Sequence, residues 1–158
     1  TAIVVTGRAG AAMAAQLGSM RVTEQIDAMD VMGVSSIQYL ITPRIVASMI
    51  SMPLLCGLFI LVGLVGAYFT SVYLLNIDPT LFSSHLQEFV QVRDLVQGLI
   101  KAAIFGMVFS LIGTYKGYYT QGGAEAVGQS TNVAVVITLV LVLVSDYFIT
   151  LVIRSVLY

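Results

Sequence analysis

Two opposite charges, Lys101 and Asp146, stand alone inside long apolar stretches of the chain. A single charge costs roughly 2.5–3.5 kcal/mol at the centre of a membrane, so each of these side chains should have a partner. Each lies about 15 residues from the polar segment that joins the two stretches, which on antiparallel helices puts both roughly 22 Å from the same membrane face. We therefore expect the two side chains to form an ion pair or to share a polar network.

The role of this pair has two interpretations. A structural pair would only fix the register of two helices, whereas a functional site would touch lipid headgroups or exchange partners. Arg8, also in apolar surroundings, could meet a lipid phosphate, reach towards the membrane surface, or pair with a carboxylate. Lys101, Asp146 and Arg8 are the candidate polar residues inside the membrane.

The segment RVTEQIDAMDVMG, residues 21–33, carries three carboxylates next to apolar stretches. Thr23 is placed to cap a helix that starts at Glu24, and Gly33 suits a left-handed helix end, which predicts a short amphipathic helix over 22–33. Helices that bind the membrane surface favour Lys and Arg, so an acidic face indicates docking into a groove of a protein partner. The alternative is a solvated interfacial helix. The candidate contact residues are Thr23, Glu24, Gln25, Asp27, Met29, Asp30 and Met32.

Other reactive side chains give no pattern typical of catalysis or metal binding. His85 has no second His or Cys beside it, and Cys56 lies in an apolar run, so we expect a surface histidine and an inert thiol rather than a metal site. Tyr118 and Tyr119 are interpreted as interfacial or packing aromatics. The sequence lacks a GxxxxGK[ST] phosphate loop, so ATP hydrolysis would have to come from another protein. We expect neither enzyme activity nor a cofactor.

The composition is typical of an integral membrane protein. Of 158 residues, 58% are hydrophobic and 9% are charged, with a mean hydropathy of +0.97, whereas a soluble domain carries about 25% charged residues. The chain has no basic cluster that would indicate nucleic acid as a partner. We expect an all-α fold, a polytopic transmembrane helical bundle with a short cytoplasmic helix.

Apolar runs that reach about 20 residues can cross a bilayer as helices. The expected order is the end of a span (1–20), the short helix (22–33), a span (45–75), a segment with a turn at Asp78-Pro79 and a short amphipathic helix (76–92), a span (94–116), a Gly-rich loop (117–131) and a span (132–157). Arg21, Arg44 and Lys116 lie at one set of span ends, and Arg93 and Arg154 at the other. Because basic residues favour the cytoplasmic side, we expect 22–33 and 117–131 in the cytoplasm and 76–92 outside.

Small residues recur every four positions on two of these segments. One stripe is Thr6, Gly10, Ala14 and Gly18, and the other is Gly98, Ala102, Gly106, Ser110 and Thr114. Such stripes let helix backbones approach closely in membranes. They indicate either tight packing within one subunit or the seam of a dimer.

The segment GRAGAAMAAQLGSMRVTEQIDAMDVMGVSSIQYLITPR resembles the MlaE family of ABC-transporter permeases. The residues that carry the resemblance are Gly7, Arg8, Gly10, Thr23, Glu24, Gln25, Ala28, Met29, Pro43 and Arg44. It continues through SMPLL (51–55), LIKAAIFG (99–106), the glycine-rich loop (117–128) and Asp146, and so covers nearly the whole chain. The family's N-terminal interfacial helix and first span have no counterpart here, so the resemblance implies the C-terminal part of one permease domain.

The resemblance also implies a function and its partners. MlaE-type permeases are multi-pass homodimers in the bacterial inner membrane, and they move phospholipid between the inner and outer membranes of Gram-negative bacteria. They assemble with a cytoplasmic MlaF-type ATPase, a ring of MlaD-type MCE protein and often an MlaB-type STAS protein. Residues 22–33 would then be the coupling helix, which sits in a groove of the ATPase.

The position of the first long span in the family implies a lipid cavity lined by Leu61, Leu64, Val65 and Tyr68. Two other classes of function stay open from the residues alone. One is an ion-coupled secondary transporter or channel that relays protons through Lys101 and Asp146. The other is a purely structural membrane subunit.

Overall fold

Helices make up almost all of the chain. The computed structural model describes residues 1–157, and the side chains of this range other than those of Gln87, Phe89, Val156 and Leu157. The elements in chain order are α1 (Ala2–Val5), the π-helical turn η1 (Thr6–Gly10), α2 (Ala11–Val22), α3 (Gln25–Val31), the π-helical turn η2 (Ile37–Ile41), α4 (Thr42–Phe69), the π-helical turn η3 (Thr70–Leu74), α5 (Pro79–Phe89), α6 (Val92–Tyr118) and α7 (Ala124–Leu157). No strand occurs within residues 1–157, so the expected all-α class is confirmed.

Three helical stretches are long and apolar enough to cross a membrane, namely Ile37–Leu74, Val92–Tyr118 and Ala124–Ser155. They fall where the sequence predicts spans. The predicted loop over 117–131 is wrong in extent, because α6 runs to Tyr118 and α7 already begins at Ala124. Alanine, glutamate and glutamine after Gly123 are good helix formers, so the polar character of 124–131 does not stop the helix.

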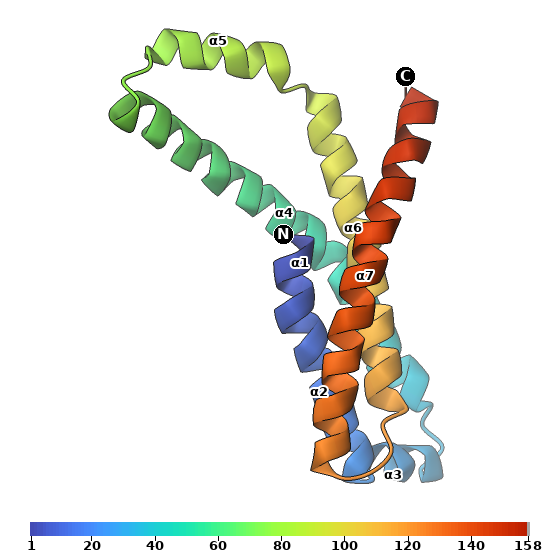
Figure 1. The fold of residues 1–158 in the computed structure, drawn as a ribbon. Coiled ribbons are helices and arrows are strands. Elements are labelled where there is room, and N and C mark those ends of the chain that lie inside the picture. Colours follow the sequence, from blue (N-terminus) through green and yellow to red (C-terminus); the bar gives the residue numbers. More distant parts are fainter. Residues whose placement is uncertain (158) are drawn as a thin grey trace.

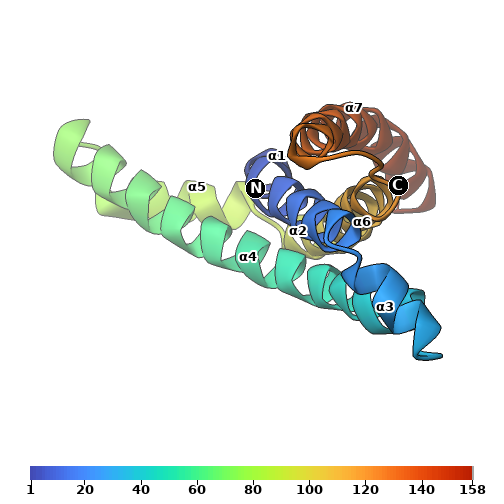
Figure 2. The same cartoon turned by 90° about the horizontal axis from the view of Figure 1, so that it is seen from below.

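Helix α6 lies at the centre of the bundle and packs against α2, α4 and α7. Figure 1 shows these helices side by side at one end of the molecule, with α3 lying across that end. Seen from below, α2 lies beside α6 and the two ends of α3 meet the ends of α2 and α4 (Figure 2). The turn between α6 and α7 is at the same end as α3, as the sequence predicts.

The two small-residue stripes bring backbones together inside this one chain. A Cβ placed on Gly106 would lie 2.6 Å from the backbone oxygen of Ser48 in α4, and one on Gly117 would lie 2.7 Å from the backbone oxygen of Ala14 in α2. Both distances are too short for a real side chain. Thr6, Gly10, Ala14 and Gly18 are buried, as are Ala102, Gly106, Ser110 and Thr114. These buried residues therefore pack within one subunit and leave no surface for a dimer seam, whereas Gly98, the first residue of the second stripe, is half-buried and has nothing within 4 Å of its Cβ position.

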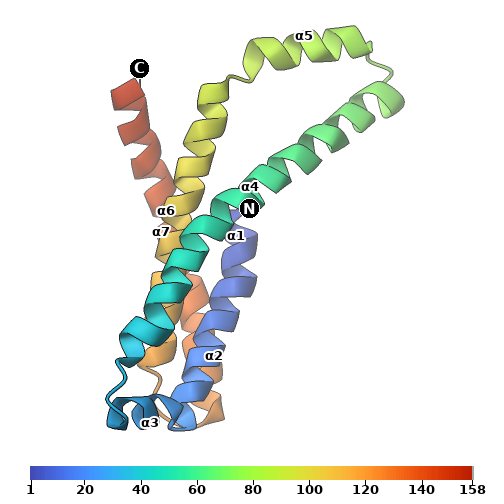
Figure 3. The same ribbon diagram turned by 180° about the vertical axis from the view of Figure 1, so that it is seen from behind.

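The far half of α4 diverges from α6, and α5 crosses between their ends (Figures 1 and 3). The start of α5 follows from Asp78 and Pro79. The Asp78 side chain accepts hydrogen bonds from the backbone N–H and the hydroxyl of Thr80 at 2.9 and 2.6 Å, which caps the helix and holds the pKa of Asp78 below its ordinary value. The predicted turn and short helix within 76–92 are confirmed.

Candidate functional site

The helix that the acidic segment forms, α3, spans Gln25–Val31 and is shorter than the predicted 22–33, because Val22 still belongs to α2. Thr23 does not cap it: the Thr23 hydroxyl donates to the backbone oxygen of Ser19 at 2.9 Å and so closes the end of α2. Glu24 follows in the left-handed region, with φ 60° and ψ 14°, and turns the chain sharply into α3. The prediction of a Thr23 cap is wrong because a threonine hydroxyl can also bond back to a carbonyl four residues earlier, which here extends α2.

The other end of α3 matches the sequence. Gly33 has φ +75°, the backbone N–H of Gly33 bonds to Asp30 at 3.1 Å and that of Val34 bonds to Met29 at 3.0 Å. This pair of bonds is the Schellman arrangement that ends many helices at a glycine. Only short turns separate α3 from α2 and from η2, so α3 is joined closely to α2 and to the span that contains α4.

The inner face of α3 is apolar and its outer face is acidic. Ile26 is fully buried against the bundle, and Met29 is half-buried. The other predicted contact residues are exposed: Thr23, Glu24, Gln25, Asp27, Asp30 and Met32. Sequence reasoning missed Val31, which is 89% exposed and lies one helical turn after Asp27. Its spacing of four from Asp27 would have placed it on the same outer face.

The Lys101–Asp146 pair forms as the sequence predicts. Lys101 Nζ on α6 donates to Asp146 Oδ1 on α7 at 3.0 Å and to the Thr150 hydroxyl at 2.7 Å. The Thr150 hydroxyl in turn donates to the backbone oxygen of Asp146. Thr150 was not among the predicted residues, although its position one turn after Asp146 is the signal that could have found it. The result is a small polar cluster between two apolar helices.

Arg8 is exposed on η1, and no carboxylate contacts it within residues 1–157. It borders a hollow of about 400 Å³ that is otherwise apolar, lined by Val4, Val5, Ala9, Ala12 and Leu55. The two remaining interpretations of Arg8, a contact with a lipid phosphate and extension towards the membrane surface, are untested.

The predicted lipid-cavity residues separate into two groups. Leu61 and Leu64 line an apolar hollow of about 260 Å³ between α4 and α6, together with Gly57, Ile60, Leu95 and Leu99. Val65 is 70% exposed and does not line it. Tyr68 instead packs edge-to-face on Phe82 of α5, with ring centres 5.6 Å apart. Val65 lies about 100° around the helix from Leu64 and therefore does not face the hollow that Leu64 lines. The far half of α4 diverges from α6 towards α5 (Figure 3), and α5 carries Phe82, the partner of Tyr68.

Comparison with known proteins identifies the family of this chain. The family model described as Permease MlaE matches residues 1–152. The chain belongs to the MlaE permease family. It is therefore an ABC-transporter permease by family and an integral membrane protein.

Individual members of the MlaE family and related permeases align along nearly the whole chain. This chain is 39% identical over 148 residues to a probable ABC transporter permease protein of Rickettsia typhi, and the alignment covers 94% of this chain and 57% of the relative. It is 41% identical over 150 residues to a probable ABC transporter permease protein of Synechocystis, with 95% and 57% covered. The Haemophilus influenzae protein named intermembrane phospholipid transport system permease protein MlaE is 35% identical over 151 residues, with 95% and 58% covered. The chain thus spans a little over half the length of these relatives.

Within this MlaE-family chain, most of the motif residues lie in α3 or in the segments that flank it, whereas Gly7, Arg8 and Gly10 lie on η1 at the other end of α2. Thr23, Glu24 and Gln25 form the elbow between α2 and α3, while Pro43 and Arg44 begin α4 after η2. This part of the motif therefore marks both connections of α3, to α2 and through η2 to α4.

Proposed function

We propose that this chain is the membrane-embedded part of an ATP-driven lipid permease, and that α3 is the coupling helix that receives force from a separate MlaF-type ATPase. The observation that carries the proposal is the place of α3. It lies across one end of the spans, it packs against α2 with Ile26 fully buried, and it presents Glu24, Asp30 and Val31 outwards. A short rigid helix in this position can pass a push from a partner to α2 and α4 without a flexible linker.

The chemistry of the outer face supports a protein partner. Glu24 and Asp30 form no ion pair among residues 1–157, whereas Asp27 is held by Arg21. These carboxylates lie around the apolar side chains of Val31 and Met32, and this pattern suits an apolar groove with basic residues at its rim on a protein partner. Charges at such an interface determine the orientation and choice of the partner more than the affinity. The end of the bundle that carries α3 would face the cytoplasm, in line with Arg21, Arg44 and Lys116.

The proposed cargo is phospholipid, moved between the inner and outer membranes of a Gram-negative bacterium. The printed name of the Haemophilus influenzae relative supports this cargo, and the apolar hollow at Leu61 and Leu64 offers a surface for acyl chains. The permease would act in the bacterial inner membrane as a homodimer, with an MlaD-type MCE ring on the α5 side and an MlaB-type STAS protein beside the ATPase. Because the small-residue stripes are buried, the second copy would contact other faces.

The Lys101–Asp146 contact favours one alternative, an ion-coupled transporter or channel that relays protons through this pair. The two functions differ in their source of energy. A permease of the proposed kind depends on ATP, whereas a proton relay responds to a pH gradient and ignores ATP.

Reconstitution in liposomes distinguishes an ATP-driven permease from a proton relay. The full-length permease is placed in liposomes with its ATPase, and the movement of a fluorescent phospholipid is followed with ATP. A matched sample carries an ATPase whose phosphate-loop lysine is changed to alanine. We expect lipid movement only with the intact ATPase and no effect of a pH gradient. Movement driven by the gradient without ATP would contradict the proposal.

A further inference from the structure

The coupling helix α3 is also fastened to a helix that is not its neighbour in sequence. Arg21, in the last turn of α2, has Nη1 2.5 Å from Oδ1 of Asp27 in α3, and its guanidinium carbon is 5.8 Å from the ring centre of Tyr118 at the end of α6. The Tyr118 hydroxyl lies 3.0 Å from the hydroxyl of Ser36, just before η2. These four residues, Asp27, Arg21, Tyr118 and Ser36, are called the elbow latch below.

The chemistry of the elbow latch needs these side chains in particular. A planar guanidinium can stack on an aromatic ring and donate to a carboxylate at the same time, which a lysine ammonium does less well. Ser36 is only 2% exposed, so its bond to Tyr118 is shielded from water and electrostatically stronger than a surface bond. The latch is thus a chain of contacts with specific geometry.

The elbow latch connects α3 to helices to which the polypeptide does not join it directly. The polypeptide connects α3 only to α2 and, through η2, to α4. Arg21 and Asp27 hold the start of α3, Ser36 follows its end, and both sides converge on Tyr118 of α6. Helix α6 continues unbroken from Tyr118 back past Lys101, which holds Asp146 of α7. A displacement of α3 therefore has a non-covalent route into the two helices that the chain does not connect to it.

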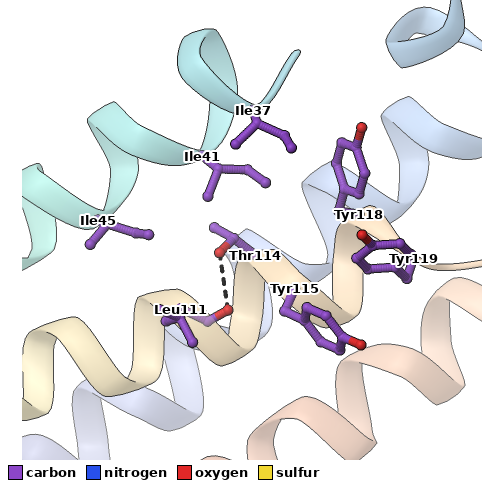
Figure 4. A pocket seen from close by; sticks show the side chains of 8 residues that line it. All are labelled: Ile37, Ile41, Ile45, Leu111, Thr114, Tyr115, Tyr118 and Tyr119. Carbon is purple, nitrogen blue, oxygen red and sulfur yellow. Dashed lines mark hydrogen bonds between the residues drawn. The ribbon is translucent and has the colours of Figure 1, made fainter. Parts of the chain in front are cut away.

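We propose that the elbow latch transmits the movement of α3 to α6, with Tyr118 as the positioning residue. This inference rests on the proposed docking of an ATPase on α3. The ring of Tyr118 also forms part of the wall of a hollow of about 300 Å³ between η2, α4 and α6, beside Tyr119 and Ile37 (Figure 4). The ring is therefore unpacked on one side and has space to turn when α3 moves.

The test measures transport and ATP hydrolysis separately in the reconstituted complex of full-length permease and ATPase. Tyr118→Phe keeps the ring under Arg21 and removes only the hydroxyl that meets Ser36. We expect ATP hydrolysis to stay near the wild-type rate, while the lipid moved per ATP falls by about threefold to tenfold, the scale of one lost hydrogen bond. Ser36→Ala should give the same loss, and the double variant should lose no more than either single variant.

Tyr119→Phe is the matched control, because Tyr119 is the next residue, is 61% exposed and makes no side-chain hydrogen bond among residues 1–157. It should leave lipid moved per ATP unchanged. An equal yield of lipid per ATP in Tyr118→Phe and wild type overturns the latch. So does an equal fall in hydrolysis and transport, because this result would place Tyr118 in ATPase docking rather than in transmission.

Failure of the latch and failure of the proposed function give different results. If the wild-type complex moves no lipid with ATP, the proposed function is wrong and the latch falls with it. If the wild type moves lipid and Tyr118→Phe moves as much per ATP, only the latch is wrong.

Discussion

The Lys101 ammonium on α6 lies 3.0 Å from the Asp146 carboxylate on α7, and the Thr150 hydroxyl shares the same ammonium at 2.7 Å. Each span carries one charge that is costly in hydrocarbon, and each charge satisfies the other. The contact therefore fixes how far α6 and α7 can slide along each other. It also connects α7 to the helix that carries Tyr118.

Breaking this pair should destabilise the bundle more than removing the neighbouring hydroxyl. We expect Asp146→Leu to lower the free energy of unfolding in lipid by about 2 kcal/mol, because Lys101 loses its counter-charge. Thr150→Val, the control, should cost about 0.6 kcal/mol, which is typical of one hydrogen bond between membrane helices. Unfolding monitored in bicelles gives both values, and equal costs for the two variants would show that the charge of Asp146 is unimportant.

The exchanged variant, Lys101→Asp with Asp146→Lys, should regain most of the stability that either single change removes. The pair can form in either direction when it only fixes register. Transport by the exchanged variant then decides between a structural and a functional role of the pair. Full transport activity supports a pair that only fixes the register of α6 and α7. A folded but inactive protein supports a site that contacts the lipid or a moving partner. An exchanged variant as unstable as Asp146→Leu would contradict the ion pair.

Glycine at 106 should be far less replaceable than glycine at 63. A Cβ at Gly106 meets the Ser48 backbone oxygen at 2.6 Å, whereas nothing lies within 4 Å of a Cβ at Gly63. We expect Gly106→Ala to lower the free energy of unfolding by about 1–3 kcal/mol through overpacking. Gly63→Ala should be neutral or slightly stabilising, because alanine favours the helix. Similar values for both would contradict the close contact of α4 and α6.

Glu24 has two separable properties, its left-handed backbone and its charge. Asparagine tolerates the same backbone region, so Glu24→Asn should leave the free energy of unfolding within about 0.5 kcal/mol of the wild type. It should still weaken binding of the ATPase at low salt, with a smaller effect at high salt where charges are screened. Binding that is unchanged at every salt concentration would exclude the Glu24 carboxylate from the proposed interface.

The cap of α5 should respond to acid. Because the Thr80 hydrogen bonds lower the pKa of Asp78 in the folded protein, the cap contributes fully above the ordinary carboxyl pKa and is lost as the pH falls through the lowered value. Protection of the α5 amides against hydrogen exchange should therefore drop in acid. Asp78→Asn keeps an acceptor without a titrating group, so its protection should not follow this pH change. Equal pH profiles would contradict the cap.

The sequence was sufficient for features that depend on apolar length and lone charges. The three spans, a short helix within 22–33 and the Lys101–Asp146 pair all follow from where hydrocarbon-compatible runs are interrupted. The sequence does not show which of two possible hydrogen bonds a threonine hydroxyl makes. The Thr23 hydroxyl can cap the helix that follows it or bond to the helix that precedes it, and only the packing of α2 decides.

Contacts between distant side chains that are not lone opposite charges could not be derived from one sequence. Tyr118 was interpreted as an interfacial or packing aromatic, because nothing in the local pattern connects it to Ser36, 82 positions away in the chain. Val65 and Tyr68 were assigned to the lipid cavity because the family resemblance implies a cavity along this span. Val65 does not line the hollow because it lies about 100° around the helix from Leu64. The contact of Tyr68 with Phe82 depends on where the whole fold places α5.

Contact between α3 and a nucleotide-hydrolysing subunit is the central claim, and site-directed cross-linking tests it most directly. Val31→Cys in a full-length permease freed of all other cysteines, Cys56 included, places one exposed thiol on the outer face of α3. Leu81→Cys on α5, at the opposite end, is the matched control. We predict an adduct between position 31 and the ATPase whose yield changes when an ATP analogue is added, and no such adduct from position 81. Two results together would contradict the account: position 31 forms no adduct with the ATPase, and a membrane-impermeant thiol reagent labels it from the periplasm.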